Sequence, residues 1–343
     1  MDKRVIFAVA GSGKTTHLID ELDLERRVLL ITYTENNFAH LRFRVLQKFG
    51  YLPPNIVVCT YFKFLHNFCY RPLLQMRLGS RGMNFHLPPA QTARFALTQD
   101  ARYLDGRRRL YHNRLAKLLE VKGCLPAILA RMERYFDRVF VDEVQDFGGH
   151  DFNLLAALCR ANTDVLFVGD FFQHTFDTSR DGSVNRTLHD DFGAYAQRFA
   201  AQGITVDRQS LRASRRCSTT VCDFIREHLQ IDMHAHEARN SDLSVVEQAP
   251  LAKELYRDPV IVKLFYSSHT RYGCFSHNWG ASKGMDHFRD VCVVLGPDAW
   301  ARLQSGDLQR LAPQTRNKLY VACSRARENL YFVREHDLRE FRN

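Results

Sequence analysis

Residues 8–16 read Ala-Val-Ala-Gly-Ser-Gly-Lys-Thr-Thr and directly follow the apolar run Val5–Phe7. Glycines at positions 11 and 13 would let backbone N–H groups close around phosphate oxygens, and a helix beginning near Lys14 would direct its positive end at the same anion. Lys14 would then reach the β- and γ-phosphates, and the Thr15 hydroxyl would bind Mg²⁺. The order strand, glycine-rich turn, helix predicts a nucleotide-phosphate loop in an α/β fold, with a plain strand-to-helix turn as the alternative. The residues expected to contact the nucleotide are Ala10, Gly11, Ser12, Gly13, Lys14, Thr15 and Thr16.

A second apolar run ends in carboxylates, because residues 139–146 read Val-Phe-Val-Asp-Glu-Val-Gln-Asp. If this strand lies parallel to the first, Asp142 would stand beside the loop and hold the Mg²⁺ shell, and Glu143 would polarise an attacking water. Phosphoryl transfer to a metabolite needs only the metal carboxylate, so the adjacent Glu143 indicates hydrolysis. The alternative is an acidic helix cap after a strand.

Composition agrees with a nucleic-acid partner without establishing one. The 343 residues are 45% hydrophobic, which is enough for two domains with proper cores. Lys and Arg number 48 against 38 Asp and Glu, and the resulting charge of +10 suits a polyanion, although many basic proteins bind no nucleic acid. Nine cysteines without a Cys-x-x-Cys pair suggest neither a zinc site nor a disulfide framework. His228, His234 and His236 are interpreted as solvated loop residues rather than a metal cluster.

The chain shows no signal peptide and no apolar run of membrane-spanning length, so we expect a cytoplasmic protein that does not contact a membrane. Short β-rich apolar runs alternate with helical patterns, and this predicts mostly parallel sheets flanked by helices. We place a first lobe over 1–190, with a helical insertion at about 71–135, and a second lobe over 191–343. The expected strands of the first lobe are Val5–Val9, Val28–Thr32, Ile56–Thr60, Val139–Asp142 and Val165–Gly169, and those of the second are Ile204–Val206, Val260–Phe265, Val291–Leu295 and Leu330–Val333.

Two segments between the strands carry their own expectations. Gly106-Arg107-Arg108-Arg109-Leu110 is followed by Arg114, Lys117 and Lys122 interleaved with leucines, which predicts a basic amphipathic helix. This helix is either a solvated face or a nucleic-acid contact through Arg107, Arg108 and Arg109. The least patterned segment, His234–Pro250, is interpreted as a surface loop.

With these motifs in order, the chain resembles superfamily 1 helicases of the UvrD/Rep type from Val5 to Val333. The family fold has two RecA-like lobes. Asp142–Asp146 is similar to the Asp-Glu-x-Gln-Asp signature. Gly169–Gln173 is similar to the Gly-Asp-x-x-Gln motif, whose glutamine, here Gln173, senses the γ-phosphate.

Further matches imply contacts with nucleic acid and with the transferring phosphate. Ile31–Thr34 and Thr60–Phe64 resemble motifs that touch single strands, implying roles for Thr34, Thr60 and Phe62. Leu211–Cys217 and Leu319–Arg327 resemble the motifs that carry two arginine fingers, which would be Arg216 and Arg325. Ser282–Asp286 resembles Ala-Lys-Gly-Leu-Glu and places Gly284 and Asp286 at the nucleotide. Arginines on a second lobe reach the phosphate only when the cleft closes, which couples hydrolysis to motion.

The resemblance implies an ATP- and Mg²⁺-dependent motor on single-stranded nucleic acid, with DNA favoured over RNA and a possible nuclease or other protein partner. The chain departs from the family in its short insertions and in the aromatic that follows the glutamine motif, where residues 175–180 offer only Phe176. Phe171 and Phe172 would compensate if exposed, because a ring can stack on a base; the alternative is that they are core residues. An RNA helicase, and a nucleotide-controlled subunit that clamps nucleic acid without translocating, remain alternative interpretations.

Overall fold

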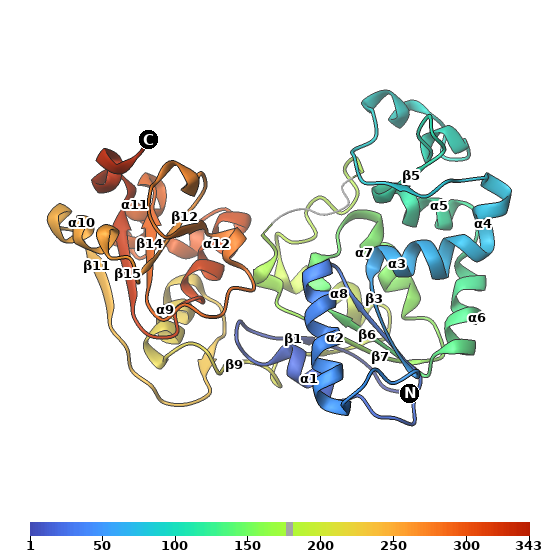
Figure 1. Cartoon of the computed structure of the whole chain (residues 1–343), viewed down its shortest axis with the longest axis horizontal. Coiled ribbons are helices and arrows are strands. Elements are labelled where there is room, and N and C mark those ends of the chain that lie inside the picture. The colour runs from blue at the N-terminus through green and yellow to red at the C-terminus, as the bar shows by residue number, and fades with distance from the viewer. Residues whose placement is uncertain (176–180) are drawn as a thin grey trace. The chain divides into compact units, whose positions relative to one another are not determined.

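The computed structural model describes residues 1–175 and 181–343, so Phe176 lies outside the described residues. The chain divides into two compact units (Figure 1). Unit 1 comprises Met1–Ile6, Lys14–Gly169 and the described part of Asp177–Asp207. Unit 2 comprises Phe7–Gly13, the described part of Asp170–Phe176 and Arg208–Asn343. The units therefore do not correspond to a single cut in the sequence, because the loop Phe7–Gly13 packs with unit 2 while the helix after it packs with unit 1.

Unit 1 is built on a sheet with strand order β3-β2-β6-β7-β1-β8. The pairs β2/β3, β2/β6, β6/β7 and β1/β8 are parallel. Our assignment of the strand near residue 205 to the second lobe is wrong, because Val206 pairs with Val5 in this sheet. The strands are β1 (Lys3–Phe7), β2 (Val28–Thr32), β3 (Ile56–Thr60), β6 (Arg138–Asp142), β7 (Asp164–Gly169) and β8 (Thr205–Asp207).

Helices cover this sheet, and local signals set their ends. All five residues of β2 are buried, as expected for a parallel strand covered on both faces. The helix that follows begins after Thr34, whose hydroxyl accepts the Asn37 N–H, and stops at Gly50 in the left-handed conformation (φ 77°). The helices of unit 1 outside the insertion are α1 (Lys14–Asp20), α2 (Glu35–Phe49), α3 (Tyr61–Lys63), α7 (Gly149–Leu158) and α8 (Phe192–Ala200).

The insertion is helical at its two ends and irregular between them. A π-helical segment, Phe64–Tyr70, continues α3 into the insertion. The prediction of one basic helix from Gly106 is wrong: the helix starts at Leu115, and Arg107–Arg109 form a turn held by Asp105, which accepts the N–H groups of Arg107 and Arg109. Arg114 is buried and pairs with Asp181 at 2.9 Å. The elements of the insertion are α4 (Arg71–Leu78), β4 (Met83–Asn84), β5 (Leu110–Tyr111), α5 (Leu115–Val121) and α6 (Leu125–Tyr135).

Unit 2 carries a parallel sheet in the order β11-β15-β14-β12-β13 and a short pair, β9/β10. The segment His234–Pro250, which we interpreted as a surface loop, contributes β10 and β11 and is therefore not a simple loop. The strands are β9 (Ala213–Ser214), β10 (His234–Ala235), β11 (Leu243–Val246), β12 (Val262–Phe265), β13 (Ser276–Asn278), β14 (Val291–Leu295) and β15 (Leu330–Arg334).

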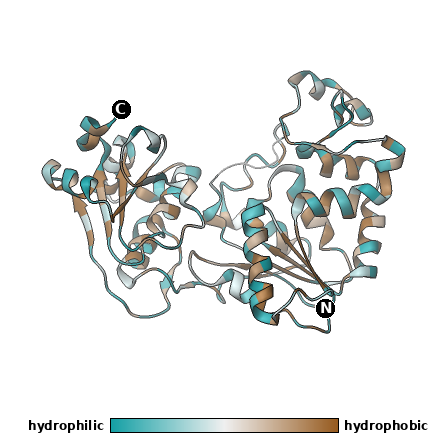
Figure 2. Ribbon diagram, in the orientation of Figure 1, coloured by the Kyte–Doolittle hydropathy of each residue, from teal (hydrophilic) through white to brown (hydrophobic). Residues whose placement is uncertain are grey.

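Alternating side chains of this sheet build two cores. Val291, Val293 and Leu295 of β14 face one core, whereas Cys292 and Val294 face the other. Figure 2 shows the strands of both units as predominantly hydrophobic. The helices of unit 2 are α9 (Thr219–Leu229), α10 (Ala249–Arg257), α11 (Pro297–Ser305) and α12 (Pro313–Cys323). The predicted fold class, α/β with mostly parallel sheets flanked by helices, is confirmed. Within the described residues, no helix combines the length and apolar character needed to cross a membrane.

Candidate nucleotide site

The carboxylates predicted to act in hydrolysis lie where β6 ends in unit 1. Asp142 is the last residue of the strand and is buried, and its Oδ1 accepts the Glu143 N–H at 3.0 Å. Glu143 adopts the left-handed conformation (φ 57°), which costs a non-glycine residue about 1–3 kcal/mol and persists only where the surroundings enforce it. Gln145 Nε2 donates to the Glu143 carboxylate. The backbone strain and this hydrogen bond together fix the direction of the Glu143 side chain.

Gly169 at the end of β7 supports that arrangement from the neighbouring strand. A Cβ atom on residue 169 would lie 2.3 Å from Gln145 Oε1, so the Gln145 amide rests directly on the glycine backbone. Gln145 is fully buried. We did not predict a role for either residue, although both belong to the motifs quoted above and could have been found there.

Lys14, Thr15 and Thr16 start α1, which packs against β6. Lys14 and Thr15 are half-buried, and Thr16 is exposed, with its hydroxyl accepting from Arg44 Nη2 at 3.1 Å. A buried carboxylate and a hydroxyl are oxygen donors of the kind that Mg²⁺ prefers, and Mg²⁺ takes its other ligands from phosphates and water. Among residues 1–175 and 181–343, no group of three or more His, Cys, Asp or Glu could hold a metal ion. A Mg²⁺ that arrives with a nucleotide does not need such a group, because phosphates and water supply most of its ligands.

The predicted phosphate loop, from Phe7 to Gly13, packs within unit 2. Gly11 and Gly13 have φ of 72° and 90°, so both use the left-handed freedom that the sequence predicts. Ser12 Oγ is buried and has no hydrogen-bond partner among the described residues, as expected where a ligand supplies one. The Ala10 N–H donates to the Tyr320 hydroxyl at 2.7 Å, and that hydroxyl donates to Asp170 Oδ2 at 2.8 Å.

Asp170 also anchors the predicted phosphate sensor. Gln173 Nε2 donates to Asp170 Oδ2 at 2.9 Å, and the Phe172 N–H donates to Oδ1 at 3.1 Å. Phe171 is a buried core residue and Phe172 is half-buried under the Arg316 guanidinium, so Phe171 cannot stack on a base. Tyr320 thus joins the phosphate loop to the Gln173 motif within unit 2. We missed Tyr320, whose only signal is its place in the Leu319–Arg327 motif.

The two candidate arginine fingers meet on one carboxylate. Arg216 Nη2 lies 2.6 Å from Asp286 Oδ2, and Arg325 Nη1 lies 2.9 Å from Asp286 Oδ1. Arg325 is only 1% exposed, and this burial, with the charge of Arg216, lowers the pKa of Arg325 to about 10. Two guanidinium groups sharing one carboxylate leave a surplus positive charge, which favours an anion. Gly284, with φ of 82°, makes the turn before Asp286.

Gly11 brings the phosphate loop against this cluster. A Cβ on Gly11 would lie 2.6 Å from the Arg216 Cβ and 2.8 Å from Ser214 Oγ. The Arg215 N–H donates to the Gly11 carbonyl at 2.9 Å. Unit 2 therefore combines loop residues Phe7–Gly13 with Arg216, Asp286 and Arg325. Unit 1 combines Lys14–Thr16 with Asp142 and Glu143.

The residues predicted to touch nucleic acid lie in unit 1, after β2, at and just after the end of β3, and in the insertion. The Thr34 and Thr60 hydroxyls accept backbone N–H groups at the starts of α2 and α3. Phe62 is half-buried and packs edge-on against Tyr33 at 5.5 Å between ring centroids. Arg107 is exposed, the Arg108 guanidinium donates to the Leu78 and Gly79 carbonyls, and Arg109 pairs with Asp105 at 2.8 Å.

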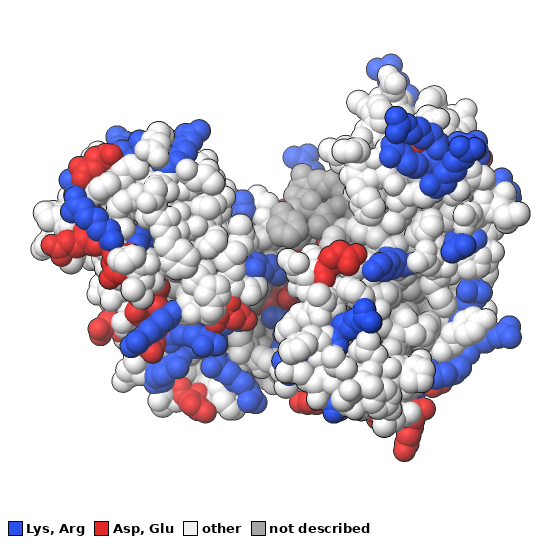
Figure 3. Space-filling view, viewed as in Figure 1, with Lys and Arg blue, Asp and Glu red and all other residues white. Residues whose placement is uncertain are grey.

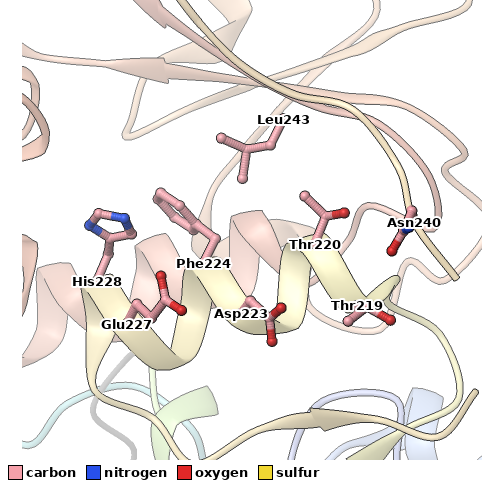
Figure 4. A pocket seen from close by; sticks show the side chains of 8 residues that line it. All are labelled: Thr219, Thr220, Asp223, Phe224, Glu227, His228, Asn240 and Leu243. Carbon is pink, nitrogen blue, oxygen red and sulfur yellow. The ribbon is translucent and has the colours of Figure 1, made fainter. Parts of the chain in front are cut away.

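A pocket of about 380 Å³ lies along α9 in unit 2 and contains none of these residues (Figure 4). Phe224 and His228 extend from the helix toward the segment that carries Leu243. Two carboxylates, Asp223 and Glu227, line it, so it does not suit a polyphosphate. The lining residues are Thr219, Thr220, Asp223, Phe224, Glu227, His228, Asn240 and Leu243.

Comparisons with known proteins identify similar solved structures. No protein-family model matches the chain, and no curated protein matches it. An arterivirus nonstructural protein 10 (helicase) in complex with DNA is 17% identical, with a TM-score of 0.47, over 96% of this chain and 60% of that one. The same arterivirus protein in another crystal structure is 16% identical, with a TM-score of 0.47, over 96% and 59%. The PRRSV helicase is 15% identical, with a TM-score of 0.48, over 98% and 53%. The chain thus spans little more than half the length of these helicases.

Proposed function

We propose that this chain is a nucleic-acid-dependent ATPase motor, a single-stranded DNA translocase or helicase resembling the UvrD/Rep type of superfamily 1. The observation that carries the proposal is the packing of Gly11 against Arg216, which shares Asp286 with Arg325. A glycine-rich phosphate loop beside two arginines is suited to a nucleoside triphosphate, because guanidinium groups stabilise charge on a transferring phosphoryl group.

Each predicted residue has a defined task in this proposal. Lys14 grips the β- and γ-phosphates, and Glu143 accepts a proton from the attacking water in the direction set by Gln145. Asp142 and the Thr15 hydroxyl would hold Mg²⁺, which neutralises phosphate charge when bound. Arg216 and Arg325 stabilise the transition state, and Gln173 reports the γ-phosphate. We propose two lobes, predicted over 1–190 and 191–343, with residues 191–207 moved to the first lobe because α8 and β8 belong to unit 1.

The first test separates nucleotide binding from hydrolysis. Lys14→Ala and Glu143→Gln should both abolish ATP hydrolysis, but Glu143→Gln should still bind MgATP because Glu143 acts on the water. Binding of a fluorescent ATP analogue and phosphate release measure the two steps. Equal loss of nucleotide affinity in both variants would show that Glu143 is misassigned.

The second test concerns the track and the motor. ATPase stimulation by single-stranded DNA and RNA oligonucleotides compares the two tracks, because discrimination depends on contacts to the 2′-hydroxyl. A non-translocating clamp on nucleic acid is the alternative. Displacement of streptavidin from biotinylated strands distinguishes them, since a clamp does not push.

A further inference from the structure

A short two-stranded ladder in the insertion ends in stacked rings. In this parallel pair Met83 lies beside Leu110 and Asn84 beside Tyr111, so the next residues, Phe85 and His112, emerge side by side. Their ring centroids are 5.3 Å apart with an interplanar angle of 25°. Phe62, which follows β3, packs edge-on against Phe85 at 5.3 Å and His112 at 5.6 Å. We call Phe62, Phe85 and His112 the aromatic shelf.

The shelf leaves an aromatic face open to solvent. Phe85 is 59% exposed even though it stacks on His112, so one face of its ring remains available. The Nδ1 atom of His112 lies 3.2 Å from the Asn84 carbonyl oxygen. Desolvation lowers the pKa of His112, so the imidazole ring that stacks on Phe85 is neutral near pH 7. A large ring stabilises a fold chiefly when it is buried, so an exposed stack of this kind favours a ligand with a flat surface.

Positive charge gathers at the opposite end of the same ladder. The Arg81 N–H donates to the Arg108 carbonyl at 2.9 Å, which places Arg81 beside the turn Arg107–Arg109. Arg81, Arg107 and Arg108 are exposed, and Figure 3 shows Lys and Arg side chains concentrated over this part of the insertion. Because the pair is parallel, the arginines precede both strands and the rings follow both. At about 3.3 Å per extended residue, the four residue steps from Arg81 to Phe85 span at most roughly 13 Å.

We propose that the aromatic shelf stacks the bases of single-stranded nucleic acid while the arginines at the other end of the ladder hold its phosphates. This inference rests on the proposed function. A single strand presents bases on one side and phosphates on the other. The rings of the shelf suit the bases, and the arginines at the other end of the ladder suit the phosphates. A duplex is excluded as the occupant because the faces of its bases are covered by their neighbours.

The test compares variants of Phe85 by fluorescence anisotropy, using labelled oligothymidylate and oligouridylate without nucleotide. Phe85→Leu removes the stacking face while keeping an apolar side chain, and should weaken binding about 5- to 150-fold, the range for loss of one base stack. Phe85→Trp should retain affinity. Tyr51→Ala is the control, because Tyr51 is a similarly exposed ring (50%) outside the shelf. Tyr51 lies before β3, whereas Phe62 of the shelf lies after it. The fluorescence of an oligonucleotide carrying 2-aminopurine should be quenched on binding to the wild type and not on binding to Phe85→Leu.

The outcomes separate the two proposals. If the wild type binds single strands and Phe85→Leu binds them equally well, the shelf is refuted while the motor stands. If the wild type hydrolyses no ATP, or gains no hydrolysis from single strands, the motor fails, and the anisotropy series still decides the shelf. Equal losses in Phe85→Leu and Tyr51→Ala would also refute the shelf, because they would show a general effect of removing exposed rings. Equal losses of affinity for oligothymidylate and oligouridylate in Phe85→Leu would show that the shelf contacts the bases rather than one type of sugar.

Discussion

Gly169 is the position where the structure makes the sharpest prediction, because no space exists there for a side chain. A Cβ would lie 2.3 Å from Gln145 Oε1, 2.7 Å from Val144 Cγ1 and 3.0 Å from the Val144 nitrogen. Both neighbours are fully buried and cannot move into solvent. We expect Gly169→Ala to lower the free energy of unfolding by about 1–3 kcal/mol, the usual cost of adding a methyl group to a packed interior.

The same substitution should reduce hydrolysis, because Gln145 donates to the Glu143 carboxylate and a displaced Gln145 takes Glu143 with it. A misplacement of about 1 Å can cost roughly 10²-fold in rate. Urea unfolding followed by circular dichroism measures stability, and phosphate release measures turnover. Gly106→Ala is the control, since a Cβ there meets no atom within 4 Å. If the two variants share the same urea midpoint and the same turnover, packing on Gly169 does not hold Glu143 in place.

Three further predictions concern the candidate arginine fingers, the buried His150 of α7 and the arginine turn of the insertion. Arg216→Ala and Arg325→Ala should each lower nucleic-acid-stimulated turnover on the order of 10³-fold, and near-normal phosphate release would identify a residue without a finger role. Desolvation, and then the charge of Lys117, lowers the pKa of His150, so stability present above about pH 6.5 should be lost as the pH falls toward the lowered value. His150→Asn should flatten that loss by up to about 1.4 kcal/mol per pH unit in chemical unfolding, and an unchanged slope would contradict it. Changing Arg107–Arg109 to alanine should flatten the plot of log K for single-strand binding against log salt concentration, by about 0.7 for each arginine that contacts a phosphate. An unaltered slope would show that this turn is a solvated surface without phosphate contacts.

Local patterns predicted the bounds of two strands of unit 1 correctly, one fully buried and one partly exposed. β2 and β3 have the expected bounds because apolar, β-branched runs there stand between polar residues. The basic helix failed because Asp105 captures the N–H groups of Arg107 and Arg109, a turn contact that competes with helical hydrogen bonds. β11 was missed because Leu243–Val246 is a short edge strand that gains its hydrogen bonds only from β15.

The sequence by itself predicted the candidate phosphate loop, the carboxylates at the end of β6 and the two candidate arginine fingers, because each prediction depends on residue types at fixed short spacings. Only the tertiary structure decided which groups share a partner. Asp286 binds both Arg216 and Arg325, and Tyr320 joins Ala10 to Asp170 across long separations in the chain. The aromatic shelf likewise depends on the pairing of β4 with β5, which lie more than twenty residues apart. Such contacts arise from strand pairing and side-chain packing between distant segments, and no local pattern encodes them.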